Sequence, residues 1–253
     1  IVQKVVLSLQ GDVSALPPAE REEPVVLHVD RSQRYAMPSL GVCYAGGPVN
    51  PHWDYLRVNL CSGERVQPLR EAAALGIPLE VALFTDNPET DFPAWNGELQ
   101  ALQGAIGRYL VFAADGKITT PAIAAAARRL LPAGAPIGGG TNSHFVEVNC
   151  KREAVPVLDF VSWAIDPHVH ARDGRTVFEN LQGQGAMGVS AKVFAADKPL
   201  HLSTIELPLD PYEAAWATAS LSTLAQAGAA SIVYSRETPF LAAILAPKPL
   251  GVY

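Results

Sequence analysis

Short apolar runs alternate with longer segments of helical periodicity along the chain from Pro38 onward. Eight of these runs have the length of a buried strand. They are Ser39–Tyr44, Tyr55–Leu60, Leu79–Phe84, Tyr109–Ala113, Pro136–Gly139, Phe160–Ile165, Leu202–Glu206 and Ser231–Tyr234. Such alternation is typical of βα units in a parallel sheet. Eight units within roughly 215 residues predict a closed (β/α)8 barrel of the α/β class, whereas an open doubly wound sheet, the alternative, more often has about five to seven strands.

Several segments between the runs carry helix signals. Apolar residues spaced four, three and four apart, from Trp95 to Ile106, predict one buried helix face. Three polar residues stand where a first helical turn would begin: Thr120, Asp210 and Thr176. The helices that they open are expected over residues 122–131, residues 211–227 and the segment ending at residue 181.

Residues 1–36 have a different pattern. Two β-like runs, Val2–Leu9 and Val25–Val29, flank a stretch rich in Pro and Glu. We expect residues 1–36 to come from, or link to, a neighbouring N-terminal β domain that packs on the barrel, and residues 37–253 to form the barrel itself. Because the chain begins inside a strand-like run and without a signal peptide, we also expect an upstream segment to be missing.

Composition excludes several classes of protein. The 19 Lys and Arg residues against 25 Asp and Glu residues give a net charge of −6, so a basic nucleic-acid surface is not expected. No apolar run approaches the ~18 residues of a transmembrane helix, which predicts a soluble protein without a membrane partner. Three cysteines without metal-ligand spacing argue against a disulfide framework and favour a reducing, cytoplasmic location.

Polar residues near the carboxyl ends of the strand runs are the candidates for chemistry, because the βα loops of a barrel meet at one open mouth. We select as substrate-binding or catalytic candidates Arg57, Asn59, Asp115, Asn142, Glu147, Asn149, Asp166, His168, His170, Glu206, Tyr234 and Glu237. Thr85, Asp86, Thr141, His144 and Ser235 occupy similar positions.

The densest polar cluster runs from Trp163 to Asp173 and holds two imidazoles and two carboxylates. His168 and His170 have the spacing of a metal-ligating pair. Only His201, at the buried start of the seventh strand run, follows as a further histidine, so neither a metal site nor a cofactor is expected. An acid, base or substrate-orienting role is favoured, and histidines that merely cap the loop are the alternative.

Two carboxylates on opposite walls of a barrel mouth, Asp115 and Glu206, could cleave a glycosidic bond. Gly116 directly after Asp115 equally fits a carboxylate that closes a turn.

The glycines from Gly138 to Gly140 lack the pattern of a phosphate-binding loop, and we expect them to allow close backbone approach beneath a substrate. The chain has no GxSxG nucleophile elbow. Cys43 and Cys61 end the first two strand runs, where buried inert thiols are favoured over nucleophiles.

Three segments together resemble the D-apionate lactonase family: residues 138–149, 159–171 and 227–237. The resemblance covers roughly residues 37–240, and it implies a β-rich domain followed by a glycosidase-like barrel that opens a branched sugar lactone to the sugar acid. The family pattern has Asp at the position of Asn142 and a Trp near Phe240, so we interpret the chain as a divergent member.

The resemblance implies that six of the candidates line a sugar site: Asn142, Glu147, Asn149, His168, His170 and Glu237. Our hypothesis is that Glu237 or Glu147 acts as the base in lactone hydrolysis, with His170 as acid or orienting partner. A glycoside hydrolase with Asp115 and Glu206, and a non-catalytic barrel that binds a carbohydrate, remain the alternatives. The expected partner in each case is a small sugar or sugar lactone.

Overall fold

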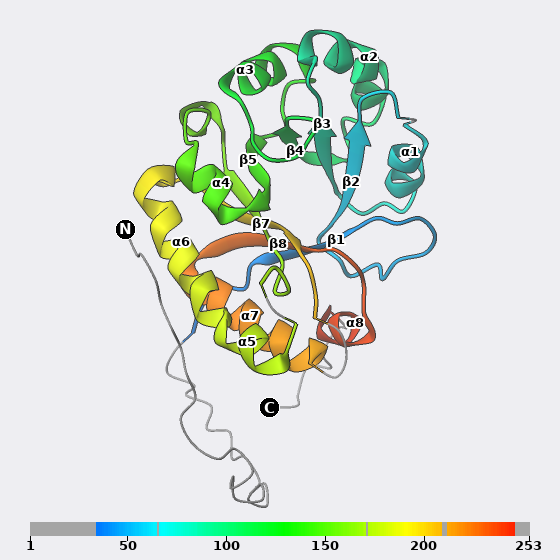
Figure 1. The fold of residues 1–253 in the computed structure, drawn as a ribbon. Helices are drawn as coiled ribbons and strands as arrows, with labels where there is room; N and C mark the ends of the chain where they lie inside the picture. The colour runs from blue at the N-terminus through cyan, green and yellow to red at the C-terminus, as the bar shows by residue number, and fades with distance from the viewer. Residues whose placement is uncertain (1–33, 65, 171, 209–211, 246–253) are drawn as a thin grey trace, which may run out of the picture. The chain divides into compact units, whose positions relative to one another are not determined.

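The structure, a computed structural model, describes residues 34–64, 66–170, 172–208 and 212–245. Its centre is a closed barrel of eight parallel strands in sequential order (Figure 1). The strands are β1 (Ser39–Cys43), β2 (Tyr55–Cys61), β3 (Leu79–Phe84), β4 (Ile106–Phe112), β5 (Ile137–His144), β6 (Val161–Ile165), β7 (Leu200–Ile205) and β8 (Ala229–Tyr234). The predicted (β/α)8 architecture is confirmed.

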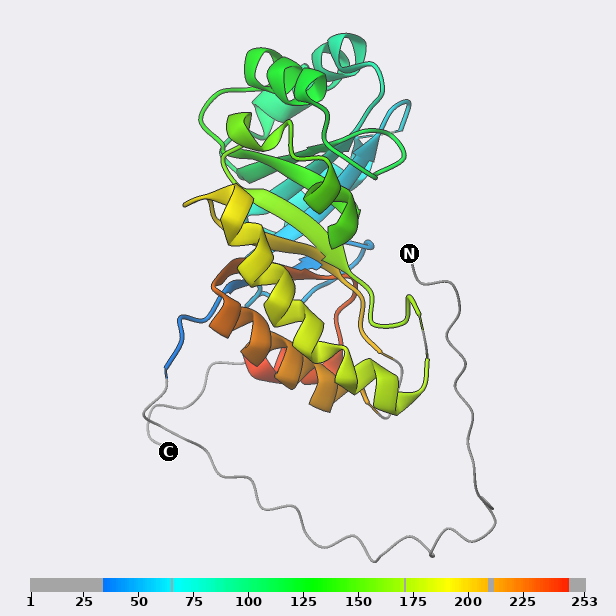
Figure 2. The same ribbon diagram turned by 60° about the vertical axis from the view of Figure 1, so that its left-hand side comes forward.

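Helices follow the strands around the outside of the barrel. They are α1 (Gln67–Ala73), α2 (Pro88–Ala101), α3 (Pro121–Leu130), α4 (Phe145–Cys150), α5 (Gly174–Glu179), α6 (Leu181–Ala195), α7 (Glu213–Ala227) and α8 (Pro239–Leu245), with a short 3-10 helix η2 (Val155–Val157). The two longest, α6 and α7, lie side by side in both views (Figures 1 and 2). In the described part of the chain, no helix has the length and apolar character needed to span a bilayer.

Two of the predicted helix starts can be compared with the structure. The Thr120 hydroxyl accepts the N–H of Ile123 at 3.2 Å and caps α3, as expected. The prediction for Thr176 was wrong, because α5 begins earlier, where the Asp173 carboxylate accepts the N–H of Thr176 at 2.9 Å. An earlier side chain thus provides the cap. Asp210 lies outside the described residues.

The predicted helix face around Trp95 is shorter than the apolar spacing implied. Trp95 and Leu99 are buried on α2, but the helix ends at Ala101. Ile106 belongs to β4, where it pairs with Leu79 of β3, so this strand begins before the predicted Tyr109. A residue at helical spacing can therefore belong to the next strand when a short turn intervenes.

The described residues form three apolar clusters. A large one fills the space between strands and helices, a small one inside the barrel comprises Ala82, Phe84, Leu110, Phe112 and Phe160, and a third comprises Ala124, Ala154 and Leu158. The rest of the interior carries buried polar side chains, which include Arg57, Glu80, His201 and Ser203. Barrel interiors are usually filled by branched apolar residues, so this polar filling marks the part of the fold where chemistry is to be sought.

Neighbouring protein atoms crowd the glycines of β5, and our expectation that they let a substrate approach the backbone stays a prediction. A Cβ at Gly138 would lie 2.1 Å from the Phe160 ring, and one at Gly139 would lie 2.3 Å from the Thr119 hydroxyl oxygen. Gly140 has a φ of +126°, and a Cβ there would lie 2.4 Å from the backbone oxygen of Ser162. Neighbouring protein atoms therefore occupy the space that the missing side chains leave.

Residues 1–33 of the predicted β segment lie outside the described residues, and residues 34–36 are described without strand structure. Tyr35–Tyr253 forms one compact unit of the chain. The N-terminal β domain stays a prediction.

Candidate active site

A buried guanidinium, that of Arg57, lies inside the barrel and is bonded to side chains of three strands. Arg57 and Asn59 alternate along β2, and Nε of Arg57 donates to the Asn59 side-chain oxygen at 2.9 Å. Nη2 donates to the side-chain oxygen of Asn142 on β5 at 2.5 Å, and Nη1 donates to the Ser203 hydroxyl on β7. Arg57 is only 1% exposed. Three strands thus hold one positive charge in a fixed orientation with neutral partners.

Glu206 supplies an exposed carboxylate at the end of β7. Its backbone N–H donates to the Ile165 oxygen at 2.8 Å, and its Oε2 accepts the Ser235 hydroxyl at 2.7 Å. Burial raises the pKa of the nearby Cys43 thiol to about 11, with Arg57 lowering it and Glu206 among the carboxylates raising it. Cys43 thus lies within the fields of both charges, and as a protonated thiol it is a poor nucleophile.

Glu206 opens onto a cavity of about 610 Å³, which we name the mouth cavity. It is lined by Asp166, His168, Arg172, Val177, Glu206, Leu207, Pro208, Tyr212 and Arg236. Asp166 Oδ1 accepts the backbone N–H of His168 at 2.8 Å and lies 3.8 Å from the imidazole Nδ1. The mouth cavity is therefore lined by two carboxylates, one imidazole and two arginines. Such groups can act as acid and base in a hydrolysis reaction.

Glu237 lies in a different place from Glu206. Its Oε2 accepts the indole N–H of Trp53 at 2.7 Å and the backbone N–H of Asn50 at 3.1 Å. It lines a separate cavity of about 410 Å³ together with the loop after β1, which includes Gly46 and Pro48. In this structure Glu237 ties the loop after β1 to the end of β8.

His170 and His168, predicted as a pair, face different cavities. His170 lines a third cavity of about 340 Å³ with His144, Phe145 and Met187. Within the described ranges, no group of three or more His, Cys, Asp or Glu side chains could hold a metal ion. The loop after β6 thus divides the two imidazoles between two spaces.

Four further candidates have structural surroundings of their own. Glu147 is half-buried in the first turn of α4, and the Asn149 side-chain oxygen accepts from Arg152 at 2.6 Å. The Asp115 carboxylate accepts the backbone N–H of Lys117 at 3.0 Å, so it closes the turn that Gly116 had indicated. Tyr234 has no exposed surface and packs against Trp53 with ring centroids 6.4 Å apart, so its side chain faces the layer beneath the helices.

Several residues near the site were not predicted from the sequence. Arg236 lines the mouth cavity and donates to the buried Glu213 at 2.7 Å. Ser203 donates to Glu80 at 3.2 Å and accepts from Arg57. Glu80 interrupts the apolar run Leu79–Phe84, and this single charge inside a strand was the available signal.

Comparison with known proteins adds family evidence to this geometry. Residues 62–213, more than half of the chain, match the family described as D-apionate lactonase, TIM barrel domain. A D-apionate lactonase from Brucella anthropi is 37% identical over 90 residues, which cover 35% of this chain and 15% of that protein. The match thus involves only a small part of that relative.

Two solved structures share the fold. A curdlan-specific exo-β-1,3-glucanase of family GH128 (subgroup III) from Blastomyces gilchristii has a TM-score of 0.51 at 14% identity, covering 78% of this chain and 88% of that chain. A GH30 endoxylanase from Clostridium papyrosolvens has a TM-score of 0.52 at 9% identity, covering 81% of this chain and 67% of that chain.

Proposed function

This chain belongs to the D-apionate lactonase family, and we propose that it hydrolyses a small sugar lactone in the mouth cavity. One observation carries the proposal: the carboxylate of Glu206 and the imidazole of His168 line the same cavity, whose volume of about 610 Å³ is of the size that holds a small ligand. The family match supports the lactone as the class of substrate, and the cavity supports the location.

In the proposed reaction Glu206 acts as the general base. It accepts a proton from water, and the water oxygen forms a bond to the lactone carbonyl carbon. The bond between that carbon and the ring oxygen then breaks, and His168 supplies the proton that makes the ring oxygen a hydroxyl. The Ser235 hydroxyl, 2.7 Å from Glu206 Oε2, holds the carboxylate in position.

Arg57 is proposed to stabilise the negative charge that develops on the carbonyl oxygen. Its guanidinium has five N–H donors, and three of them are bonded to Asn59, Asn142 and Ser203. Because the side chain is 1% exposed and does not line the mouth cavity, we propose that its positive charge acts on the carbonyl oxygen through the electric field. A positive charge already fixed before the substrate binds requires little reorganisation during the reaction. Asn59 and Asn142, which flank it, are proposed to bind the sugar hydroxyls.

This proposal assigns the base differently from the sequence hypothesis. Glu237 already accepts two hydrogen bonds, from Trp53 and Asn50, in a cavity that shares only Arg236 with the lining of the mouth cavity. Among the described residues, Glu206 has one side-chain donor, Ser235, and it lines the mouth cavity together with His168. We therefore place Glu206 in the catalytic role and Glu237 in a loop-holding role.

A panel of aldonolactones tests the proposal. Acid release is followed with a pH indicator for the wild-type protein, Glu206→Gln and Glu237→Gln. We expect Glu206→Gln to lower kcat at least about 100-fold, the usual contribution of a general base, while its melting temperature stays close to that of the wild type. Loss of turnover in Glu237→Gln with full turnover in Glu206→Gln would show that the base has been assigned to the wrong carboxylate.

The same protein preparations distinguish the two alternative functions. Aryl glycosides are assayed in parallel by absorbance of the released aryl group. Aryl release that Glu206→Gln abolishes, without acid release from any lactone, would make the mouth cavity a glycosidase site. If neither the lactones nor the aryl glycosides are hydrolysed, but calorimetry shows that a sugar lactone binds, the barrel would be a carbohydrate-binding module.

A further inference from the structure

A further cavity lies at the opposite end of the barrel from the mouth, where the strands begin. We name it the N-terminal cavity, and its volume is about 350 Å³. Its lining comes from the starts of all eight strands and the residues just before them: Ser39, Asp54, Tyr55, Pro78, Leu79, Gly107, Arg108, Pro136, Asp159, Phe160, Pro199, His201, Ala230 and Ser231. None of the residues of the mouth cavity belongs to this set.

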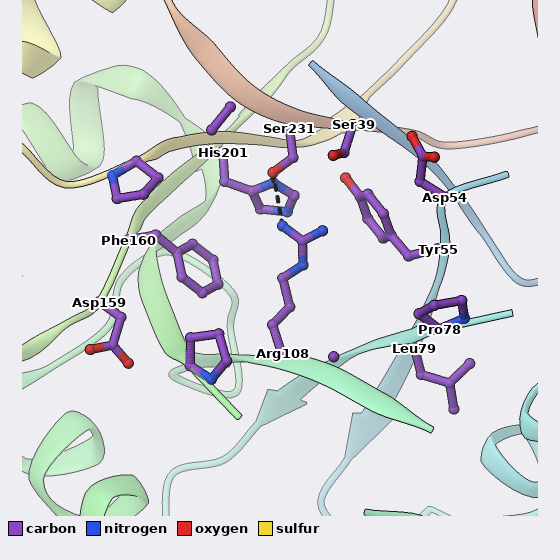
Figure 3. A pocket seen from close by; sticks show the side chains of 14 residues that line it. Ser39, Asp54, Tyr55, Pro78, Leu79, Arg108, Asp159, Phe160, His201 and Ser231 are labelled. Carbon is purple, nitrogen blue, oxygen red and sulfur yellow. Dashed lines mark hydrogen bonds between the residues drawn. The ribbon is translucent and has the colours of Figure 1, made fainter. Parts of the chain in front are cut away.

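Arg108 is the cation of this cavity. It reaches from β4 across the opening to Ser231 on β8, with the rings of Tyr55 and Phe160 on either side (Figure 3). Its Nη1 donates to the Ser231 hydroxyl at 2.9 Å, and its guanidinium carbon lies 4.1 Å from the centre of the Tyr55 ring. The side chain is 21% exposed. Two contacts thus fix the orientation of a guanidinium that still reaches solvent.

Fully enclosed polar groups lie next to Arg108. Glu80 Oε2 is 3.6 Å from Arg108 Nε and 2.5 Å from His201 Nε2, although the latter pair lacks the direction of a regular hydrogen bond. The Nδ1 atom of His201 contacts the Ser231 hydroxyl. Glu80 and His201 are 0% and 1% exposed. The cavity therefore ends on a charged cluster and not on the apolar residues usual in a barrel.

Glu80 and Arg108 differ in how far they are enclosed. Burial lowers the pKa of His201, with Arg57 and Arg108 adding to the effect against the opposing influence of Glu80. Burial alone would raise the pKa of Glu80, but His201 and the two arginines outweigh it and the net shift is downward. The Glu80 side chain is 0% exposed, whereas the Arg108 side chain is 21% exposed and lines the cavity. Arg108 is therefore the charged group of this cluster that a ligand in the cavity can reach.

The walls around the cation are mostly apolar. Three prolines, Pro78, Pro136 and Pro199, lie around the opening with Leu79 and Phe160. Of the two carboxylates at the edge, Asp159 is paired with Arg128 at 2.6 Å, and the exposed Asp54 accepts the Leu40 N–H at 2.7 Å. A cavity with apolar walls and one fixed cation matches a ligand with an apolar body and one negative group.

We propose that the N-terminal cavity binds a small organic monocarboxylate, with its carboxylate against Arg108 and its apolar body against Phe160 and the three prolines. Arg108 presents further guanidinium N–H donors beside the one given to Ser231, and a planar fork of donors suits a carboxylate. The proposal is independent of the reaction at the mouth, because the two cavities share no lining residue.

Benzoate, with benzyl alcohol as its neutral counterpart, is the probe. Calorimetry on the full chain measures both ligands against the wild-type protein, Arg108→Gln, Arg108→Lys and the control Arg129→Gln, which removes an exposed arginine on α3. We expect Arg108→Gln to weaken benzoate binding at least about tenfold, Arg108→Lys to weaken it less, and Arg129→Gln to leave it unchanged. Equal affinity for benzyl alcohol, or unchanged benzoate affinity in Arg108→Gln, would overturn the proposal.

A second measurement locates the ligand without any substitution. In amide NMR spectra of the wild-type protein, benzoate should shift the signals of Gly107 and Ala230 at the N-terminal cavity and leave that of Leu207 at the mouth cavity unmoved. Shifts confined to Leu207 and its neighbours would place the ligand at the proposed lactone site and refute a second site. This result stands even when Arg108→Gln does not fold.

Discussion

The Glu80 carboxylate lies 2.5 Å from Nε2 of His201 inside the barrel, and neither side chain reaches solvent. Glu80 comes from β3 and His201 from β7, so the pair joins opposite walls of the closed barrel. Burial and this contact shift the pKa of both groups from their values in the unfolded chain. The free energy of unfolding must therefore depend on pH.

Stability is expected to fall as the pH is lowered. The pKa of His201 lies below its ordinary value of 6.5 in the folded state, so below about pH 6.5 the unfolded chain takes up a proton that the folded chain does not. The depressed pKa of Glu80 gives a contribution that is complete above its ordinary value of 4.5 and is lost as the pH falls further. The free energy of unfolding in urea, measured between about pH 7.5 and pH 4, should decrease in both ranges.

His201→Gln should remove the part of this decrease that lies near pH 6, because the substituted amide does not titrate. The exposed His52 provides the matched control, and His52→Gln should keep the wild-type slope. An unchanged slope in His201→Gln would mean that other groups cause the loss of stability.

Two glycines should respond in opposite directions to the same substitution. A Cβ at Gly138 would lie 2.1 to 2.4 Å from atoms of the Phe160 ring, so Gly138→Ala is expected to destabilise the protein by about 1 to 3 kcal/mol through overpacking. Gly97 lies within α2, and a Cβ there would meet no other atom within 4 Å, so Gly97→Ala should stabilise the protein by about 0.5 to 1 kcal/mol. Chemical denaturation of both variants measures the two signs, and a stable Gly138→Ala would show that the Phe160 ring is free to move aside.

The cap of α5 gives a further test of the local structure. Asp173 accepts the Thr176 N–H at 2.9 Å, and this backbone bond contributes most to lowering the pKa of its carboxyl group. Asp173→Ala should lower the melting temperature, as the loss of an N-cap does, while Thr176→Ala should lower it less. Thermal denaturation compares the two variants, and a larger loss in Thr176→Ala would restore the cap that the sequence predicted.

The sequence was sufficient to predict the barrel because parallel strands are buried on both faces. Runs such as Leu79–Phe84 and Phe160–Ile165 therefore appear as largely apolar stretches with one polar residue each, and their number and spacing indicate closure. The exact strand ends were less predictable: β4 begins at Ile106 because backbone pairing with β3 extends past the apolar run.

The site was harder to predict because the backbone path of each loop decides which cavity a side chain lines. His168 and His170 are two residues apart yet line different cavities, and Glu206 and Glu237 also lie apart. The buried cluster was missed for another reason: Glu80 is a single charge within an apolar strand, and its partner His201 lies far away in sequence. Only the closed barrel brings the two together.

Cys43 and Cys150 should differ strongly in reactivity towards iodoacetamide. Burial raises the pKa of the Cys43 thiol to about 11, so at pH 8 only about 0.1% of it is the reactive thiolate. Cys150 at the end of α4 is exposed. Mass spectrometry of peptides taken at successive times should show Cys150 modified first and Cys43 at least about tenfold more slowly, and Cys150→Ser should abolish the fast phase. Modification of Cys43 as fast as Cys150 would contradict a protonated, shielded thiol at the mouth and would return Cys43 to consideration as a nucleophile.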